Sequence, residues 1–330
     1  MTLHLDPVDH ELLDRWQCDF PLVSKPFSVM ARRLVLTEDE VLRRLRSLSE
    51  AGAISRIGAT CRPNTAGAST LAAVAVPDSR IEEVAAVIGG EPGVNHSYLR
   101  ENRWNIWFVA TGPDRAQVNG CLARIGRRTG LEVLDLRLVR PFNINLGFAL
   151  DGSGKLPPQR ENIDTAVLIP GDREIMQALN VGLEIVAQPF NALGEQLRRP
   201  ESELLQRIEA LAAAGILSRI GVIVRHRALG WSSNAMVVWD LPEEEIPRVG
   251  PALTAVPGIT LCYQRRPVPG VWPYSLYCMI HARSRVEAMT VLDSACDEVG
   301  LRDVPHQVLF SVRCFKQTGA RVLLEKGAAA

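Results

Sequence analysis

The chain is a tandem repeat, which limits it to folds that can be built twice. One constant shift aligns "LRRLRSLSEAGAISRIG" in the first half with "LQRIEALAAAGILSRIG" in the second, so that Gly58 corresponds to Gly221. Farther along, "PGVNHSYLR" corresponds to "PGITLCYQR" after a small change of shift, which indicates a short insertion in a loop. A chain of 330 residues is long enough for each copy to bury a core of its own. We therefore expect two copies of one fold.

Within each copy the hydrophobic pattern changes once, from helical to strand spacing. Residues 8–19 and 38–52 carry apolar side chains three and four positions apart, and Thr37 precedes the second run with Glu40 three residues later, which is typical of a helix start. From "ISRIG" onward the spacing predicts the order β-α-β-β-α-β of a ferredoxin-like domain. The predicted class is therefore α+β, with a winged helix-turn-helix followed by a ferredoxin-like (βαββαβ) domain in each copy.

The same pattern predicts where these segments begin and end. The polar run "DGSGKLPPQRENID", which contains Gly and Pro, separates the two copies as a linker. The predicted segments are 1–58 and 165–221 for the helix-turn-helix domains, 59–150 and 222–330 for the ferredoxin-like domains, and 151–164 for the linker.

Charge and cysteine usage narrow the function classes. The formal net charge is zero, which argues against a general binder of polyanions. The seven cysteines are scattered without the spacing of a zinc site, which favours a reducing compartment. The first residues show no signal-peptide pattern, and no apolar run approaches the roughly 20 residues of a membrane span. We therefore expect a cytoplasmic protein without a metal site of its own.

The helical part of the first copy, "FSVMARRLVLTEDEVLRRLRSLSEAGAISRIGA", resembles the DNA-binding end of the Lrp/AsnC transcription regulators. A regulator that senses a tetrapyrrole or an amino acid is therefore one hypothesis. Against it, the matching helix of the second copy reads "ESELLQRIEALAAAG", and its acidic residues would face phosphates that require Lys or Arg. The first copy has the more basic surface, with Arg32, Arg33, Arg43, Arg44 and Arg46. DNA binding by the first copy stays an alternative to a scaffold that no longer binds DNA.

The strand motifs resemble a different branch of this superfamily, the siroheme decarboxylases. The motifs are "RHRALGW", "LCYQRRPVPGVWPYSLYCMIHARSR" and "LEVLDLRLVRPFNINLGF". In that family two related subunits, of NirD and NirL type, pair to make the enzyme. Residues 1–150 resemble the NirD type and residues 165–320 the NirL type, so the chain resembles a fused form whose two halves pair with each other.

The resemblance implies a carboxy-lyase. It would remove CO2 from the acetate side chains on rings C and D of siroheme, giving 12,18-didecarboxysiroheme on a route to heme d1 or heme b. It implies no cofactor, because the iron belongs to the substrate, and siroheme and its product as partners, without DNA or membrane. Such a site needs Arg to bind carboxylates, an acid to protonate the carbon that loses CO2, and apolar walls.

Two histidines distinguish the second copy from the first. His226 stands where the first copy has Pro63, and His281 stands where it has Thr111. Histidine can donate a proton near neutral pH, so we predict that both are catalytic. The pattern places them at strand ends of one sheet, where their side chains can converge.

Other polar residues are retained in both copies and suit a substrate with many carboxylates. All but four of the 37 basic residues are arginine, which binds a carboxylate through two hydrogen bonds. Strand alternation puts Tyr263 and Arg265 on one face and Arg266 on the other. The predicted substrate-binding residues are Arg225 with Arg62, Arg265 with Arg100, Tyr263 with Tyr98, and His96, which replaces the apolar Leu261.

Removing the charge of Arg225 or of Arg265 is expected to weaken substrate binding more than it alters the fold. A lost hydrogen bond to a charged group costs about 1.5 to 3 kcal/mol, or roughly tenfold to a hundredfold in affinity. Siroheme titration of Arg225→Ala and Arg265→Ala measures this loss. Unchanged affinity in either variant would remove that arginine from the site.

Overall fold

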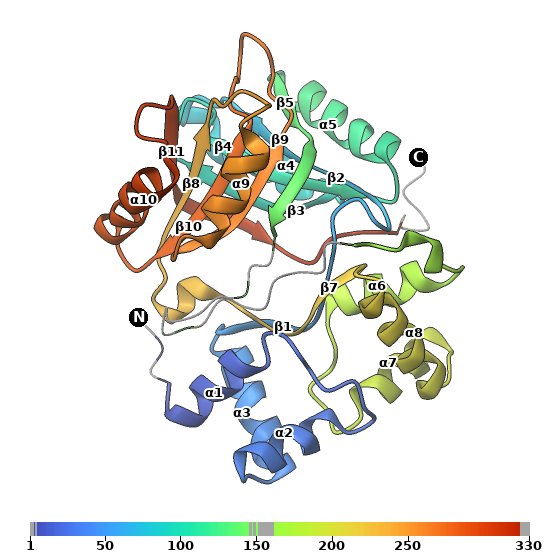
Figure 1. Cartoon of the computed structure of the whole chain (residues 1–330). Coiled ribbons are helices and arrows are strands. Elements are labelled where there is room, and N and C mark those ends of the chain that lie inside the picture. The colour runs from blue at the N-terminus through green and yellow to red at the C-terminus, as the bar shows by residue number, and fades with distance from the viewer. Residues whose placement is uncertain (1–2, 4, 145–146, 148–149, 151–161, 324–330) are drawn as a thin grey trace. The chain divides into compact units, whose positions relative to one another are not determined.

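The computed structural model of the chain describes residues 3, 5–144, 147, 150 and 162–323. Residues 151–161, most of the predicted linker, lie outside this part. The chain forms two compact units, and each unit combines a segment of the first copy with the matching segment of the second (Figure 1). The helical unit is Met1–Ala66 with Gly147–Gly230, and the sheet unit is Gly67–Leu146 with Trp231–Ala330.

The helical unit contains a three-helix bundle and a strand from each copy. Its first-copy elements are α1 (Pro7–Arg15), α2 (Pro26–Leu34), α3 (Glu38–Glu50) and β1 (Ile54–Cys61). Its second-copy elements are η2 (Thr165–Val167), α6 (Asp172–Val181), α7 (Pro189–Leu197), α8 (Glu201–Ala213), β7 (Leu217–Val224) and η3 (His226–Leu229). The predicted start of α3 is confirmed, because the Thr37 hydroxyl accepts a hydrogen bond from the Glu40 backbone N–H at 3.2 Å.

Strands β1 and β7 pair antiparallel, and two glycines stand opposite each other at the centre of the pair. Gly58 faces Gly221 in this register. The end of α1 packs on the backbone of β7, where a Cβ on Gly221 would lie 2.2 Å from the Gln17 carbonyl oxygen. The end of α6 packs on β1, where a Cβ on Gly58 would lie 2.2 Å from the Leu179 carbonyl oxygen. Each copy therefore depends on glycine in its strand to admit a helix of the other copy.

The sheet unit contains the predicted β-α-β-β-α-β order in each copy, so the α+β assignment is correct. Its first-copy elements are β2 (Ala68–Val74), η1 (Asp78–Arg80), α4 (Ile81–Gly90), β3 (Val94–Arg100), β4 (Ile106–Gly112), α5 (Arg115–Thr129), β5 (Val133–Leu136) and β6 (Leu138–Asn143). Its second-copy elements are β8 (Ser233–Trp239), α9 (Ile246–Ala255), β9 (Ile259–Arg265), β10 (Leu276–Ala282), α10 (Arg285–Val299) and β11 (His306–Gln317).

The strands of both copies join edge to edge. In the described part of the chain, nine strands form one sheet in the order β5-β2-β4-β3-β11-β8-β10-β9-β6. Strand β6 of the first copy pairs with β9 of the second, and β11 of the second copy pairs with β3 of the first. Strands β5 and β6 are opposite edges of the sheet, yet only Arg137 separates them in the chain. The two edges therefore meet, and the sheet curls around an inner face.

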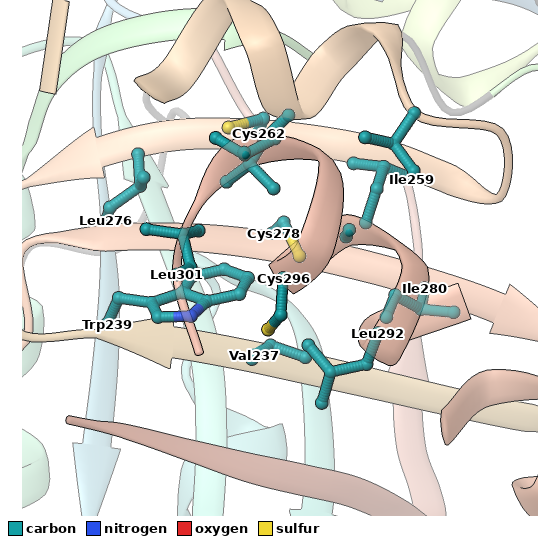
Figure 2. Packing of buried hydrophobic residues seen from close by; sticks show 14 of the residues in the cluster. Val237, Trp239, Ile259, Cys262, Leu276, Cys278, Ile280, Leu292, Cys296 and Leu301 are labelled. Carbon is teal, nitrogen blue, oxygen red and sulfur yellow. The ribbon is translucent and has the colours of Figure 1, made fainter. Parts of the chain in front are cut away.

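The sheet has an outer core under its helices and an inner core shared by both copies. Figure 2 shows the outer core of the second copy, where the free cysteines Cys262, Cys278 and Cys296 pack with Val237 and Trp239. The buried residues of the inner core are Leu71, Ala73, Trp104, Trp107, Leu134 and Leu136 from the first copy, and Met236, Val238, Tyr263, Trp272, Tyr277, Met279 and Leu309 from the second. This inner face is rich in aromatic rings.

The structure divides the chain at other places than the sequence pattern suggested. The expected boundaries after residues 58 and 221 fall inside β1 and β7, whereas the compact units divide after Ala66 and after Gly230. The reason is that β1 and β7 pair with each other and not with the large sheet. Among the described helices, none is both long and apolar enough to cross a membrane.

Gly221→Ala is expected to destabilise the protein by about 2 kcal/mol or more, because the new methyl group would collide with two backbone carbonyl oxygens of the α1 end. The melting temperature of the full chain measures this loss. Gly89→Ala is the control, since nothing lies within 4 Å of that Cβ and alanine favours the helix by about 1 kcal/mol. An equal melting temperature for Gly221→Ala and the parent would contradict the packing described here.

Candidate functional site

Two tyrosines and an arginine form a stacked group on the inner face of the second copy. Tyr263 in β9 stands directly opposite Tyr277 in β10, and their rings stack with centroids 5.8 Å apart. The Arg265 guanidinium lies 4.6 Å above the Tyr263 ring, so the predicted shared face of these two residues is confirmed. Trp272 donates its indole N–H to the Tyr277 hydroxyl at 2.7 Å. Together they make an aromatic and largely buried group.

Burial sets the protonation of this group. It raises the pKa of both Tyr263 and Tyr277, so these phenols are poor proton donors at neutral pH. Burial also lowers the pKa of Arg265, although arginine stays charged. Neither phenol is therefore a good candidate for donating a proton on this face.

Arg265 and its counterpart Arg100 each bind the backbone of the other copy. Arg265 donates from Nη1 to the Leu136 carbonyl at 2.7 Å, and Arg100 donates from Nη1 to the Leu309 carbonyl at 3.0 Å. Both carbonyls lie where the last strand of one copy crosses to the other copy. The two arginines therefore connect the two copies within the joined sheet, a role that the sequence did not predict. Their contact with substrate stays a prediction.

The first copy presents a related but different surface. Arg100 lies 5.6 Å from the Tyr98 ring, and His96 stacks on the same tyrosine with centroids 6.4 Å apart. Opposite Tyr98 stands Trp107, where the second copy has Tyr277. The ring centroid of Trp107 lies 5.2 Å from that of Trp272 in the second copy. The first copy therefore supplies an apolar ring at the position where the second supplies a phenol.

His281 lies on the same strand and the same face as Tyr277, by strand alternation. Its ring is buried, with 8% of the residue exposed. The Thr260 hydroxyl lies 2.7 Å from Nδ1, and the Asn234 side-chain amide lies 2.9 Å from Nε2. Neither Thr260 nor Asn234 was singled out by the sequence analysis.

Three predicted residues lie in the helical unit instead. Arg225 follows β7, is exposed, and donates its backbone N–H to the Ala53 carbonyl. His226 is half-buried and begins η3, and Arg62 directly follows β1 with a pKa lowered by burial. The expectation that His226 and His281 end strands of one sheet is wrong. Strand β7 pairs with β1 in a separate two-stranded sheet and ends two residues before His226.

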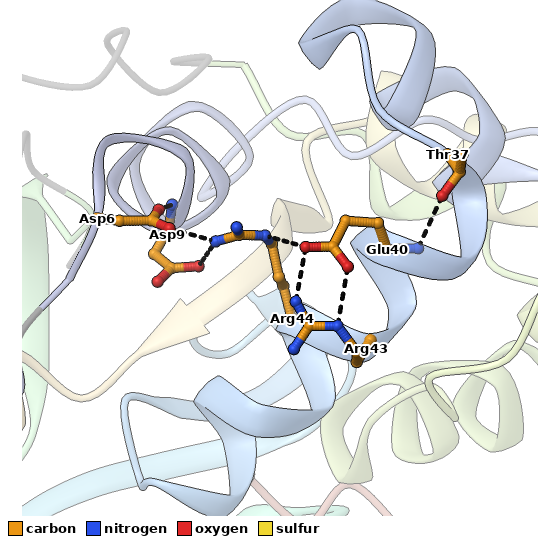
Figure 3. A network of polar contacts seen from close by, with 6 residues as sticks. All are labelled: Asp6, Asp9, Thr37, Glu40, Arg43 and Arg44. Carbon is orange, nitrogen blue, oxygen red and sulfur yellow. Dashed lines mark hydrogen bonds and ion pairs between the residues drawn. The ribbon is translucent and has the colours of Figure 1, made fainter.

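Three of the five arginines that suggested a DNA-binding surface contact other groups of the protein, and one of them, Arg46, donates to the Ile185 carbonyl. Arg44 contacts Asp6, Asp9 and Glu40 at 2.6 to 2.8 Å, and Arg43 also binds Glu40 (Figure 3). Their hydrogen bonds lower the pKa of Glu40 to about 2. Arg43 and Arg44 of α3 therefore contact the protein's own carboxylates, which weakens the case for a phosphate-binding helix.

The described residues contain no group of three or more His, Cys, Asp or Glu side chains arranged to hold a metal ion.

Comparison with known proteins gives two matching family models. The AsnC-like ligand binding domain matches residues 66–143 and 228–316. The siroheme decarboxylase NirDL-like HTH domain matches residues 9–54 and 172–217. Each model thus matches both copies.

Individual proteins match along nearly the whole chain. A siroheme decarboxylase NirDL subunit from Paracoccus denitrificans (strain Pd 1222) is 57% identical, over 96% of this chain and 98% of that protein. A crystal structure of the siroheme decarboxylase NirDL is 28% identical with a TM-score of 0.69, over 96% of this chain and 95% of that one. A crystal structure of NirDL in co-complex with an iron-uroporphyrin III analogue is 27% identical with a TM-score of 0.67, over 95% of this chain and 93% of that one.

The backbone contact of Arg265 revises the expectation that its loss would leave the fold intact. Arg265→Ala is expected to cost about 1 to 3 kcal/mol of stability, because the buried Leu136 carbonyl loses its side-chain donor. Arg266→Ala is the control, since that neighbouring side chain is exposed. Melting temperatures of the two variants test the difference, and equal values would contradict a fastening role for Arg265.

Proposed function

The chain belongs to the siroheme decarboxylase family, and from this we propose that it removes CO2 from both acetate side chains on rings C and D of siroheme. The product would be 12,18-didecarboxysiroheme, and the enzyme would be a carboxy-lyase on a route to heme d1. The observation that carries the proposal is the inner face of the sheet unit, where stacked aromatic rings lie on the same side as a hydrogen-bonded histidine. A flat macrocycle with ionisable side chains needs such a combination.

The chemistry of each step is a replacement of CO2 by a proton. The bond between the acetate methylene and its carboxylate carbon breaks, CO2 leaves, and the electron pair stays on the methylene carbon. One proton from an acid then completes a methyl group. Apolar surroundings favour the loss of CO2, because they disfavour the charged carboxylate relative to uncharged CO2. An acid with a pKa near the working pH favours protonation of the methylene carbon.

We assign the acid to histidine. His281 lies on the inner face, whereas the raised pKa of the neighbouring phenols makes Tyr263 and Tyr277 unsuitable donors. His226 is the second proposed donor, from the helical unit. The proposed carboxylate anchors are Arg225 and Arg62 with Arg265 and Arg100, and the remaining proposed substrate contacts are Tyr263, Tyr98 and His96.

Two further parts of the proposal concern what the chain needs. We propose that no resident cofactor takes part, since the iron arrives with siroheme. The two copies would pair within one chain and do the work of a NirD- and NirL-type pair, as the strand exchange between them supports. We also place the reaction in the cytoplasm, in agreement with seven free thiols.

His281→Ala and His226→Ala test the assignment. If each histidine serves one acetate, each variant should stop at a singly decarboxylated product. If they act together, both variants should bind siroheme without converting it. A catalytic acid typically contributes about 10²- to 10⁴-fold in rate, so the loss is measurable by mass spectrometry of the tetrapyrrole products.

The control is His10→Ala, which removes an exposed histidine of α1. It should convert siroheme at the parent rate. If correctly folded His281→Ala and His226→Ala also gave the doubly decarboxylated product at the parent rate, neither histidine would be the acid.

A further inference from the structure

We propose that Thr260 and Asn234 are positioning residues for His281, and that they determine which ring nitrogen exchanges the proton. The inference rests on the proposed role of His281 in decarboxylation. It is drawn from three hydrogen bonds that connect neighbouring strands of the sheet unit.

A β-bulge brings Thr260 to the histidine. In the pairing of β9 with β10, Leu261 faces Met279 and Ile259 faces Ile280, so Thr260 is an extra residue with no partner of its own in the register. Its hydroxyl therefore lies within reach of two groups on β10. It donates to the Met279 carbonyl at 3.0 Å and lies 2.7 Å from Nδ1 of His281.

The hydrogen bonds of Thr260 select one form of the ring. A hydroxyl has a single proton to donate, and that of Thr260 goes to the Met279 carbonyl. Towards His281 the hydroxyl oxygen can only accept, so Nδ1 must carry a hydrogen. The Asn234 amide N–H donates to Nε2 at 2.9 Å, so Nε2 is the nitrogen with the lone pair. The neutral ring is thus held with its proton on Nδ1.

Asn234 can also accommodate the protonated ring. Asn234 stands directly opposite His281 in the pairing of β8 with β10, so the two side chains share one face. Its other amide atom, Oδ1, is buried and has no hydrogen-bond partner in the described part of the chain. If the amide turns over, Oδ1 accepts a hydrogen bond from a protonated Nε2. The pair of neighbours therefore supports both charge states of His281 at Nε2 while Nδ1 stays protonated.

The proton exchanged in the reaction is then the one on Nε2. In the step itself, the acetate methylene–carboxylate bond breaks, CO2 leaves, and the carbon takes the proton from Nε2. The ring returns to the neutral form that Thr260 and Asn234 select, and one positive and one negative charge disappear together. For this transfer Asn234 must give up its contact with Nε2.

The first copy shows that this arrangement is not required by the fold. There the matching strand pair places Ser69 opposite Thr111, and a bulge again leaves Asn95 without a partner in the register. All three side chains differ from Asn234, His281 and Thr260, while the strands and the bulge are the same. The hydrogen-bonded set of His281, Thr260 and Asn234 therefore belongs to the second copy.

Activity of matched variants tests the positioning role. Thr260→Val keeps the shape and removes the hydroxyl, and Asn234→Leu removes the amide. Both should lower kcat for siroheme by at least about tenfold and leave KM within about threefold, because they alter the acid and not the binding groups. Thr260→Ser retains the hydroxyl and should restore most of the rate.

Two controls carry the same chemical changes elsewhere. Thr290→Val removes a hydroxyl that bonds its own helix at the Val286 carbonyl, and Asn191→Leu removes an exposed amide of α7. Both should keep the parent kcat and KM.

The ring itself supplies a readout that does not depend on activity. Proton–nitrogen correlation NMR of histidine-labelled full chain, with the His281 signals identified by their absence in His281→Ala, distinguishes the Nδ1–H from the Nε2–H form. The parent should show the Nδ1–H form when neutral, and Thr260→Val should populate the other form. A parent ring in the Nε2–H form would overturn the inference.

The two proposals can fail separately. An inactive His281→Ala together with a fully active Thr260→Val would overturn the positioning role alone. A fully active His281→Ala would overturn the proposed function of His281, and the positioning role with it, even if NMR found the ring in the Nδ1–H form.

Discussion

Main-chain pairing between the two copies is the interaction on which the sheet unit depends. The last strand of the first copy leaves β2 after Leu136 and continues along β9, and β11 of the second copy leaves β8 after Phe310 and continues along β3. Neither copy completes its sheet alone, because its last strand pairs with a strand of the other copy. This pairing covers strand edges that would otherwise be prone to aggregation. Arg265 and Arg100 bind carbonyls at the two crossings and secure the exchange.

This shared backbone leaves the inner-face side chains free to differ. Tyr277 and Trp107 occupy equivalent positions, and so do His281 and Thr111, without any change in strand order. The second copy carries polar groups at these two positions, and both have partners, since Trp272 donates to the Tyr277 hydroxyl and Thr260 and Asn234 contact the His281 ring. Such hydrogen bonds lower the cost of burying a polar group. The two copies can therefore present different side chains on the inner face while they share one backbone arrangement.

The sequence predicts features that depend on near neighbours and misses those that depend on distant ones. The cap of α3 by Thr37 needs only the next three residues, and it is confirmed. The placement of His226 was wrong because β7 takes its partner from the first copy, which the strand pattern does not reveal. The acceptor of Arg265 lies 129 residues away in the chain. Thr260 and Asn234 could have been found by asking which other positions change between the copies together with His281.

The helical unit joins the two copies through the pairing of its strands β1 and β7. A DNA-binding helix must offer its basic side chains to phosphates, but Arg44 is held by Asp6, Asp9 and Glu40, and separating it from them would cost interaction energy that a phosphate must replace. The β1–β7 pair, by contrast, requires close backbone contact at Gly58 and Gly221. Because these contacts join residues of different copies, the helical unit acts as a second fastening between the halves. The strand pairing therefore gives the helical unit a structural role in the fold.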